Sequence, residues 1–198
     1  MQSPIPIESR ALGTLAYIRT SIEASGSMAV PGMAGIVMGG IGIIATIVAS
    51  LPRGAPHWLG IWLVAAAIAF ASGGAMMARE AAQSGHARYL GPVRKFLLCL
   101  CPSLLTGAAL TFVLWHAGAT SLIPGVWLLL YGCAVLSAST VTIARTMRLI
   151  WIMGALFILL GLLAFAAPSS THTLILGMGF GALHTIFGML IGQVSHGD

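Results

Sequence analysis

Long apolar runs, separated by short polar or glycine- and proline-containing breaks, make up most of the chain after residue 30. Six of these runs approach the ~20 residues that an α-helix needs to cross a ~30 Å hydrocarbon layer. Their predicted bounds are Met33 to Leu51, Trp58 to Met77, Phe96 to His116, Leu122 to Ile143, Leu149 to Ala167, and Leu174 to Val194. Runs this long and continuous favour helices over the alternating strands of a barrel. The pattern therefore predicts an all-α membrane protein with six transmembrane helices.

Each predicted span ends at a break signal. The connectors are Leu51-Pro52-Arg53-Gly54, the polar stretch Arg79 to Lys95, Ala117-Gly118-Ala119-Thr120, Arg145 to Arg148, and Pro168-Ser169-Ser170. Short connectors of this kind join the spans into three consecutive hairpins. We therefore expect residues 30–194 to form one six-helix transmembrane domain, followed by a short tail at 195–198.

The segment 1–29 differs from the spans and does not have the pattern of a signal peptide, because no short apolar core follows a basic start. On a helical projection Leu12, Leu15, Ile18 and Ile22 share one face. This spacing predicts a short amphipathic helix, from Glu8 to Ala24, that lies on the membrane surface. The alternative is a solvated helix that docks on the bundle or on a partner.

Composition supports a membrane protein, and the distribution of charge predicts which end of the bundle faces the cytoplasm. Hydrophobic residues make up 58% of the chain, charged residues 7%, and the mean hydropathy is +1.00. The basic residues on the side of the termini are Arg10, Arg19, Arg79, Arg88, Arg94, Lys95, Arg145 and Arg148, whereas Arg53 alone falls opposite. Because Lys and Arg accumulate in cytoplasmic loops, both termini are predicted to be cytoplasmic, in the inner membrane of a bacterium. The net charge of +5 is thus a topology signal, and no nucleic-acid partner is expected.

The predicted spans contain no Asp, Glu, Lys or Arg, which weighs against a carboxylate-driven pump or antiporter. Phosphate-binding glycine loops, paired carboxylates and zinc-protease motifs are also missing from the sequence, and no enzyme is predicted. Cys99, Cys101 and Cys133 are expected to pack as small apolar residues. Pro102, inside the third span, predicts a bend or a cavity there.

His184 lies among regularly spaced glycines on the sixth span, so we expect it to be buried against another helix. The helix-packing glycines are Gly35, Gly39, Gly177, Gly181, Gly188 and Gly192. Hydroxyl groups at similar depth, which could partner His184 or line a pathway, are Ser72, Ser103, Thr106, Ser137, Ser139 and Thr140. His184 is then either a hydrogen-bonded packing residue or a haem ligand, metal ligand, proton relay or substrate contact.

Three further histidines belong at the opposite interface, because His57 opens the second span, His116 closes the third and His172 precedes the sixth. If they converge, they could bind a divalent transition metal. The alternative is that they are ordinary boundary residues, and no cofactor is the simpler expectation.

The third hairpin, with Gly154, Gly161, a Pro168 turn and then Gly177, Gly181 and Gly188, resembles the HdeD-like family of small bacterial acid-resistance membrane proteins. The resemblance covers chiefly residues 149–192 and implies a plan of two-helix repeats. The whole chain also resembles uncharacterised six-span proteins of environmental bacteria. Neither likeness implies an activity or a functional residue.

Three functions remain open from the sequence. The first is a non-enzymatic protein that acts by association in the bilayer, as a stress-related component, a homo-oligomer or a subunit of a membrane complex. The second is a small channel or carrier for a neutral solute. The third is a haem- or metal-binding membrane protein that uses His184 or the group His57, His116 and His172.

Overall fold

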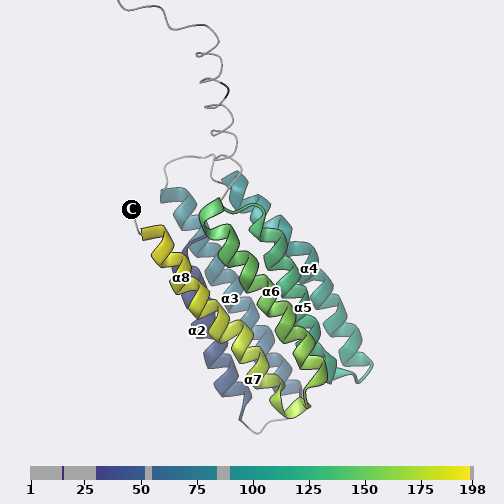
Figure 1. The fold of residues 1–198 in the computed structure, drawn as a ribbon. Helices are drawn as coiled ribbons and strands as arrows, with labels where there is room; N and C mark the ends of the chain where they lie inside the picture. Colours follow the sequence, from purple (N-terminus) through teal and green to yellow (C-terminus); the bar gives the residue numbers. More distant parts are fainter. Residues whose placement is uncertain (1–14, 16–29, 52–54, 84–89, 197–198) are drawn as a thin grey trace, which may run out of the picture.

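The computed structural model describes residue 15 and residues 30–51, 55–83 and 90–196 (Figure 1). Within these ranges the chain is helical, without a strand, and six of its helical segments are long and apolar enough to cross a membrane. The prediction of six apolar helices is confirmed. The predicted amphipathic helix from Glu8 to Ala24 lies outside the described residues except for Leu15.

Five spans are single helices: α2 (Gly32–Ala49), α3 (Ala55–Gln83), α4 (Leu90–His116), α5 (Ile123–Ser139) and α6 (Ala144–Ala166). The sixth consists of α7 (His172–Leu176), a π-helical segment η4 (Gly177–Leu183) and α8 (His184–His196). The 3₁₀ turns η2 (Thr120–Leu122) and η3 (Ser169–Thr171) precede α5 and α7.

The helices extend further than the apolar runs predicted. The expected break from Arg145 to Arg148 is wrong, because α6 begins at Ala144 and includes these residues. Likewise α3 continues to Gln83 and α4 starts at Leu90, so most of the expected polar connector is helical. Polar residues mark the end of the apolar run that can cross the hydrocarbon layer. They do not end the helix, because their backbone groups still form helical hydrogen bonds.

Exposed basic side chains gather at the end of the bundle where α3 finishes and α4 and α6 begin, and the last described residues of α8 lie there too (Figure 1). They are Arg79, Arg94, Lys95, Arg145 and Arg148. At the opposite end lie the end of α2, the start of α3 and η3. The cytoplasmic placement of the basic end remains a prediction from the sequence.

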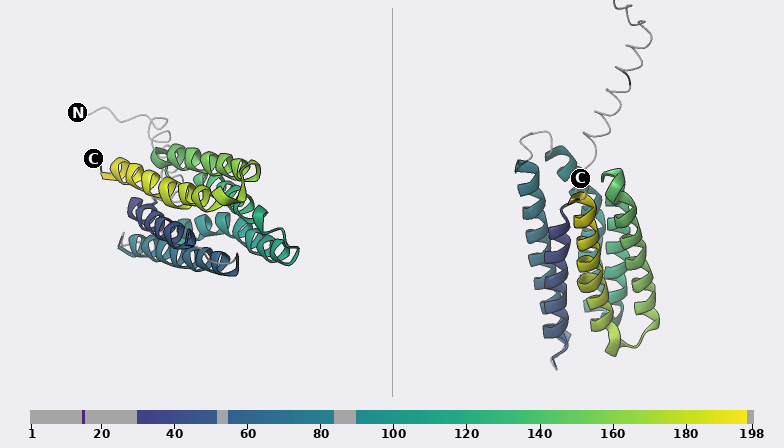
Figure 2. Two further views of the ribbon diagram at one scale, coloured as in Figure 1. Left: turned by 90° about the horizontal axis from the view of Figure 1, so that it is seen from below. Right: turned by 60° about the vertical axis from the view of Figure 1, so that its left-hand side comes forward.

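The most extensive helix contacts join α5 with α6 and α2 with α8, and α4 with α5 and α2 with α3 follow. Seen along the bundle, α8 lies between α6 and α2 (Figure 2). In contrast, α3 and α4 touch at few points. The two most extensive contacts therefore join helices that the three-hairpin plan assigns to different hairpins, whereas the next two lie within a hairpin. A repeat origin for the hairpins stays a prediction.

Glycines bring α2 and the sixth span into backbone contact. A Cβ added at Gly35 would lie 2.9 Å from Cα of Gly188, and one at Gly188 would lie 2.6 Å from the backbone nitrogen of Ile36. Gly39 meets Thr185, and Gly181 meets Ile43. Gly177 likewise faces Thr46, whereas a Cβ added at Gly192 would meet nothing within 4 Å, although the Gly192 backbone lies against Gly32. The glycine rows thus serve packing within the chain.

Candidate functional site

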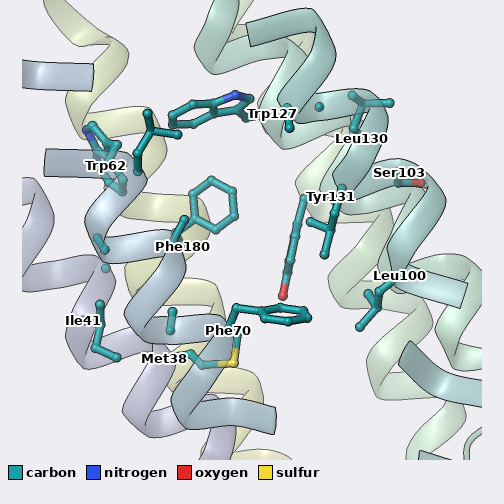
Figure 3. Close-up of a pocket in the computed structure, with 18 of the residues that line it drawn as sticks. Met38, Ile41, Trp62, Phe70, Leu100, Ser103, Trp127, Leu130, Tyr131 and Phe180 are labelled. Carbon is teal, nitrogen blue, oxygen red and sulfur yellow. The ribbon is translucent and has the colours of Figure 1, made fainter. Parts of the chain in front are cut away.

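A cavity of about 300 Å³, called here the central cavity, lies at mid-height in the bundle between α3, α4 and α5, with α2 and the sixth span behind it (Figure 3). Trp62 and Trp127 border one end and Met38 and Phe70 the other, while Tyr131 and Phe180 reach into the middle. The remaining lining is mostly Leu, Ile, Ala and Gly. The cavity is therefore apolar except for a few polar groups.

The cavity opens on the flank between α3 and α4. Leu63, Ala66 and Phe70 of α3 and Ala108 of α4 line it and are exposed on the surface of the bundle. The sparse contact between these two helices leaves this side unsealed.

Tyr131 and His184 form a polar pair on the wall of the cavity. The Tyr131 hydroxyl oxygen and Nε2 of His184 are 2.7 Å apart, which is a short hydrogen bond between α5 and α8. His184 is 4% exposed. Its Nδ1 is buried and has no hydrogen-bond partner among the described residues.

Aromatic rings hold this pair in place. Phe157 meets Tyr131 edge-on at 4.8 Å and His184 at 5.3 Å between ring centroids. Phe180 stacks on the imidazole at 6.1 Å and meets the Tyr131 ring edge-on at 5.2 Å. Because Phe157 is fully buried, the two polar groups rest on a rigid support.

The π-helical segment η4 places Phe180 and His184 together. A π-helix is wider than an α-helix, and such segments occur often at functional sites. Gly179 makes room within it, because a Cβ there would lie 2.6 Å from Leu128 and 3.0 Å from Phe157. Gly177, Gly181 and Gly188 of this span face α2, whereas Gly179 and the imidazole ring turn to α5.

A second buried polar atom belongs to the lining. Trp62 is 3% exposed, and its Nε1 has no hydrogen-bond partner among the described residues. Buried donors normally find a partner. Trp127, in contrast, donates from Nε1 to the Thr111 hydroxyl at 2.7 Å, and Thr111 donates to the carbonyl of Gly107.

The hydroxyl groups expected near His184 are dispersed. Ser103 lines the central cavity, and Ser72 lies on the same helix as several lining residues and donates to the carbonyl of Ala69. Ser139 is buried but donates to the carbonyl of Leu136. The other three are exposed: Thr106 donates to Pro102, Thr140 donates to Ser137, and Ser137 lies on the surface. His184 thus pairs with a tyrosine instead of a Ser or Thr.

The outer histidines do not form a ligand group. His57 and His116 are exposed, while His172 is buried and donates from Nε2 to the carbonyl of Ala164 at 3.0 Å. Within the described ranges, no group of three or more His, Cys, Asp or Glu side chains could hold a metal ion.

Pro102 and the cysteines lie beside the cavity rather than in it. Pro102 is exposed inside a continuous α4, one residue before the cavity-lining Ser103. Cys99 and Cys101 are half-buried, Cys133 is exposed, and all three are free.

Tyr131, Phe180, Trp62 and Trp127 are the site residues that the sequence analysis missed. An intramembrane tyrosine was the available signal, because a buried phenol needs a hydrogen-bond partner. The partner itself depends on how α5 packs against α8, which the sequence pattern does not specify.

Comparison of the chain with family models, curated proteins and solved structures found no match. Function must therefore be inferred from the residues of the central cavity.

Proposed function

We propose that this chain is a membrane-embedded binding protein of the carrier type, which takes a small, neutral, largely apolar molecule into its central cavity. The observation that carries the proposal is the Tyr131–His184 pair on the wall of an otherwise apolar cavity. Ligand sites commonly combine a mostly apolar lining with a few well-placed polar groups, and ~300 Å³ is at the small end of their range.

The polar pair suits a ligand with a single hydrogen-bonding group. When the Tyr131 hydroxyl donates to Nε2, its oxygen can still accept a hydrogen bond from the ligand. In the other tautomer Nε2 donates, and the hydroxyl proton is available to the ligand. The pair can therefore meet a hydroxyl or a carbonyl group.

The absence of charged residues from the described lining and the position of the opening support a neutral ligand that enters from the membrane. The cavity lining includes no Asp, Glu, Lys or Arg that could balance an ion. The opening between α3 and α4 admits molecules dissolved among the lipid chains. We place the basic end of the bundle in the cytoplasm of a bacterium, as the distribution of Lys and Arg favours.

Association with another subunit remains the competing function. The glycine rows favoured association in the sequence analysis. In the structure these glycines already pack against each other, where α2 contacts the sixth span. A protein that acts only by association would bind no small molecule in the cavity, and the following experiment separates the two functions.

The test uses 2-naphthol as probe, a flat neutral ring system with one hydroxyl group. Equilibrium dialysis compares the 2-naphthol retained by nanodiscs that contain the protein with that retained by empty nanodiscs. Loss of the hydrogen bond between the Tyr131 hydroxyl and the ligand, worth ~1–2 kcal/mol, predicts a 5- to 30-fold weaker Kd in Tyr131→Phe. His184→Ala keeps that hydroxyl but removes the group that orients it, and should weaken the Kd less. Naphthalene, which lacks the hydroxyl, should bind both variants as it binds the parent protein.

Two controls keep this test specific. His57→Ala removes an exposed histidine and should leave binding unchanged. Ala69→Phe fills the cavity from α3 without touching the polar pair and should abolish the binding of both probes. Equal retention by protein-containing and empty nanodiscs, or an unchanged Kd in both polar variants, would overturn the proposal.

A further inference from the structure

A second pocket lies at the end of the bundle where α2 ends and α3 begins, beside η2 and η3. This end pocket has a volume of about 520 Å³. It is far more polar than the central cavity, because hydroxyl side chains surround it: Ser50, Thr120, Ser121, Ser169, Ser170 and Thr173. Trp58 and Trp115 supply aromatic walls.

The end pocket and the central cavity lie about one helical turn apart on three helices. Along α4, Trp115 lines the former and Thr111 the latter. Along α5, the corresponding residues are Pro124 and Trp127. Leu59 and Trp62 repeat this spacing along α3. Since one turn rises only ~5.4 Å, the two spaces follow one another along the bundle axis.

A stacked pair of tryptophans links the linings of the two spaces. The rings of Trp58, from the end pocket, and Trp127, from the central cavity, have centroids 6.4 Å apart and an interplanar angle of 12°. Each indole is tethered by one hydrogen bond on its own side, Trp58 to the Thr173 hydroxyl at 2.9 Å and Trp127 to that of Thr111. Each of the two stacked rings is therefore held by a single side-chain hydrogen bond.

We propose that the end pocket is a second binding site for the same solute and that Trp58 and Trp127 form the gate between it and the central cavity. This inference rests on the proposed function. A neutral molecule with one hydroxyl or carbonyl group would meet hydroxyl side chains in the end pocket and the Tyr131–His184 pair in the cavity. The gate gives the site a second route, from the aqueous end of the bundle, beside the opening to lipid.

The experiment measures access to the central cavity without any ligand. Cys99, Cys101 and Cys133 are replaced by alanine, and Ser103→Cys introduces one thiol into the cavity lining. The protein in nanodiscs is then treated with a trimethylammonium methanethiosulfonate, a charged thiol reagent that does not dissolve in lipid. The rate of modification reports passage from water to the cavity.

Trp127→Ala and Trp58→Ala should each raise this rate about tenfold. Thr173→Val keeps both rings and removes only the tether of Trp58, so it should give a smaller increase in a protein whose packing is intact. Trp151→Ala, an exposed tryptophan of α6, is the matched control and should leave the rate unchanged.

An equal rate in the parent and in all gate variants would overturn the inference, whether that common rate is fast or slow. A rate that rises as much in Trp151→Ala as in the gate variants would also overturn it, because general loosening would then explain the increase. This result is independent of 2-naphthol binding, so failure of the gate and failure of the proposed function are distinguishable.

Discussion

Gly39 and Gly40 are neighbours on α2 that differ in their surroundings and so provide a test of the packing. A Cβ at Gly39 would contact the Thr185 hydroxyl and would lie 2.6 Å from the Thr185 backbone nitrogen and 2.8 Å from the Gly181 carbonyl oxygen. A Cβ at Gly40 would meet nothing within 4 Å. Substitution by alanine therefore adds one methyl group to α2 at either position, and only the methyl group at Gly39 clashes with the sixth span.

The clash sets the magnitude of the effect. Since ordinary contacts begin at 3.4 Å, α2 and α8 must separate by about 0.8 Å to admit the methyl group at Gly39. A gap of that size forfeits about a quarter to a half of the dispersion attraction across the interface. Overpacking of this kind costs ~1–3 kcal/mol, whereas alanine at Gly40 gains up to ~1 kcal/mol in helix propensity.

The free energy of unfolding of both variants can be measured by titration with SDS from mild detergent, with tryptophan fluorescence as the signal. We expect Gly39→Ala to lie ~1–3 kcal/mol below the parent protein and Gly40→Ala to match or exceed it. Equal stability of the two variants would refute the close contact between α2 and α8.

Two further substitutions test the core and the end of α6 by the same titration. Phe157→Ala should lose ~3–5 kcal/mol because Phe157 is fully buried, while Phe112→Ala, 67% exposed on α4, should change the stability little; similar losses would contradict the burial. His172→Ala removes the Nε2 donor to the carbonyl of Ala164 and should cost ~1–3 kcal/mol, and a neutral result would mean that this carbonyl has another partner.

Hydropathy predicts the six spans because the length and polarity of a helix that crosses lipid are local properties of the sequence. Hydropathy predicts the ends of helices less well than the spans. The helix α6, for example, begins at Ala144, before the apolar run that was predicted from Leu149. The glycine spacing identified the residues that let α2 approach the sixth span, but it did not identify α2 as the partner. The site depends on that order of helices, since Tyr131 meets His184 only when α5 packs beside α8.

The π-helical turn before His184 also determines the register of the last span. Each residue of an α-helix advances the direction of its side chain by about 100°, so a segment with wider turns changes the direction in which all later residues point. Within η4 that change lets Gly181 face α2, while His184, at the start of α8, faces α5. A single residue gained or lost in this segment would rotate the imidazole away from Tyr131 and turn Gly188 away from α2 at once. The Tyr131–His184 pair and the contact between α2 and the last span therefore depend on the same π-helical segment and cannot vary independently.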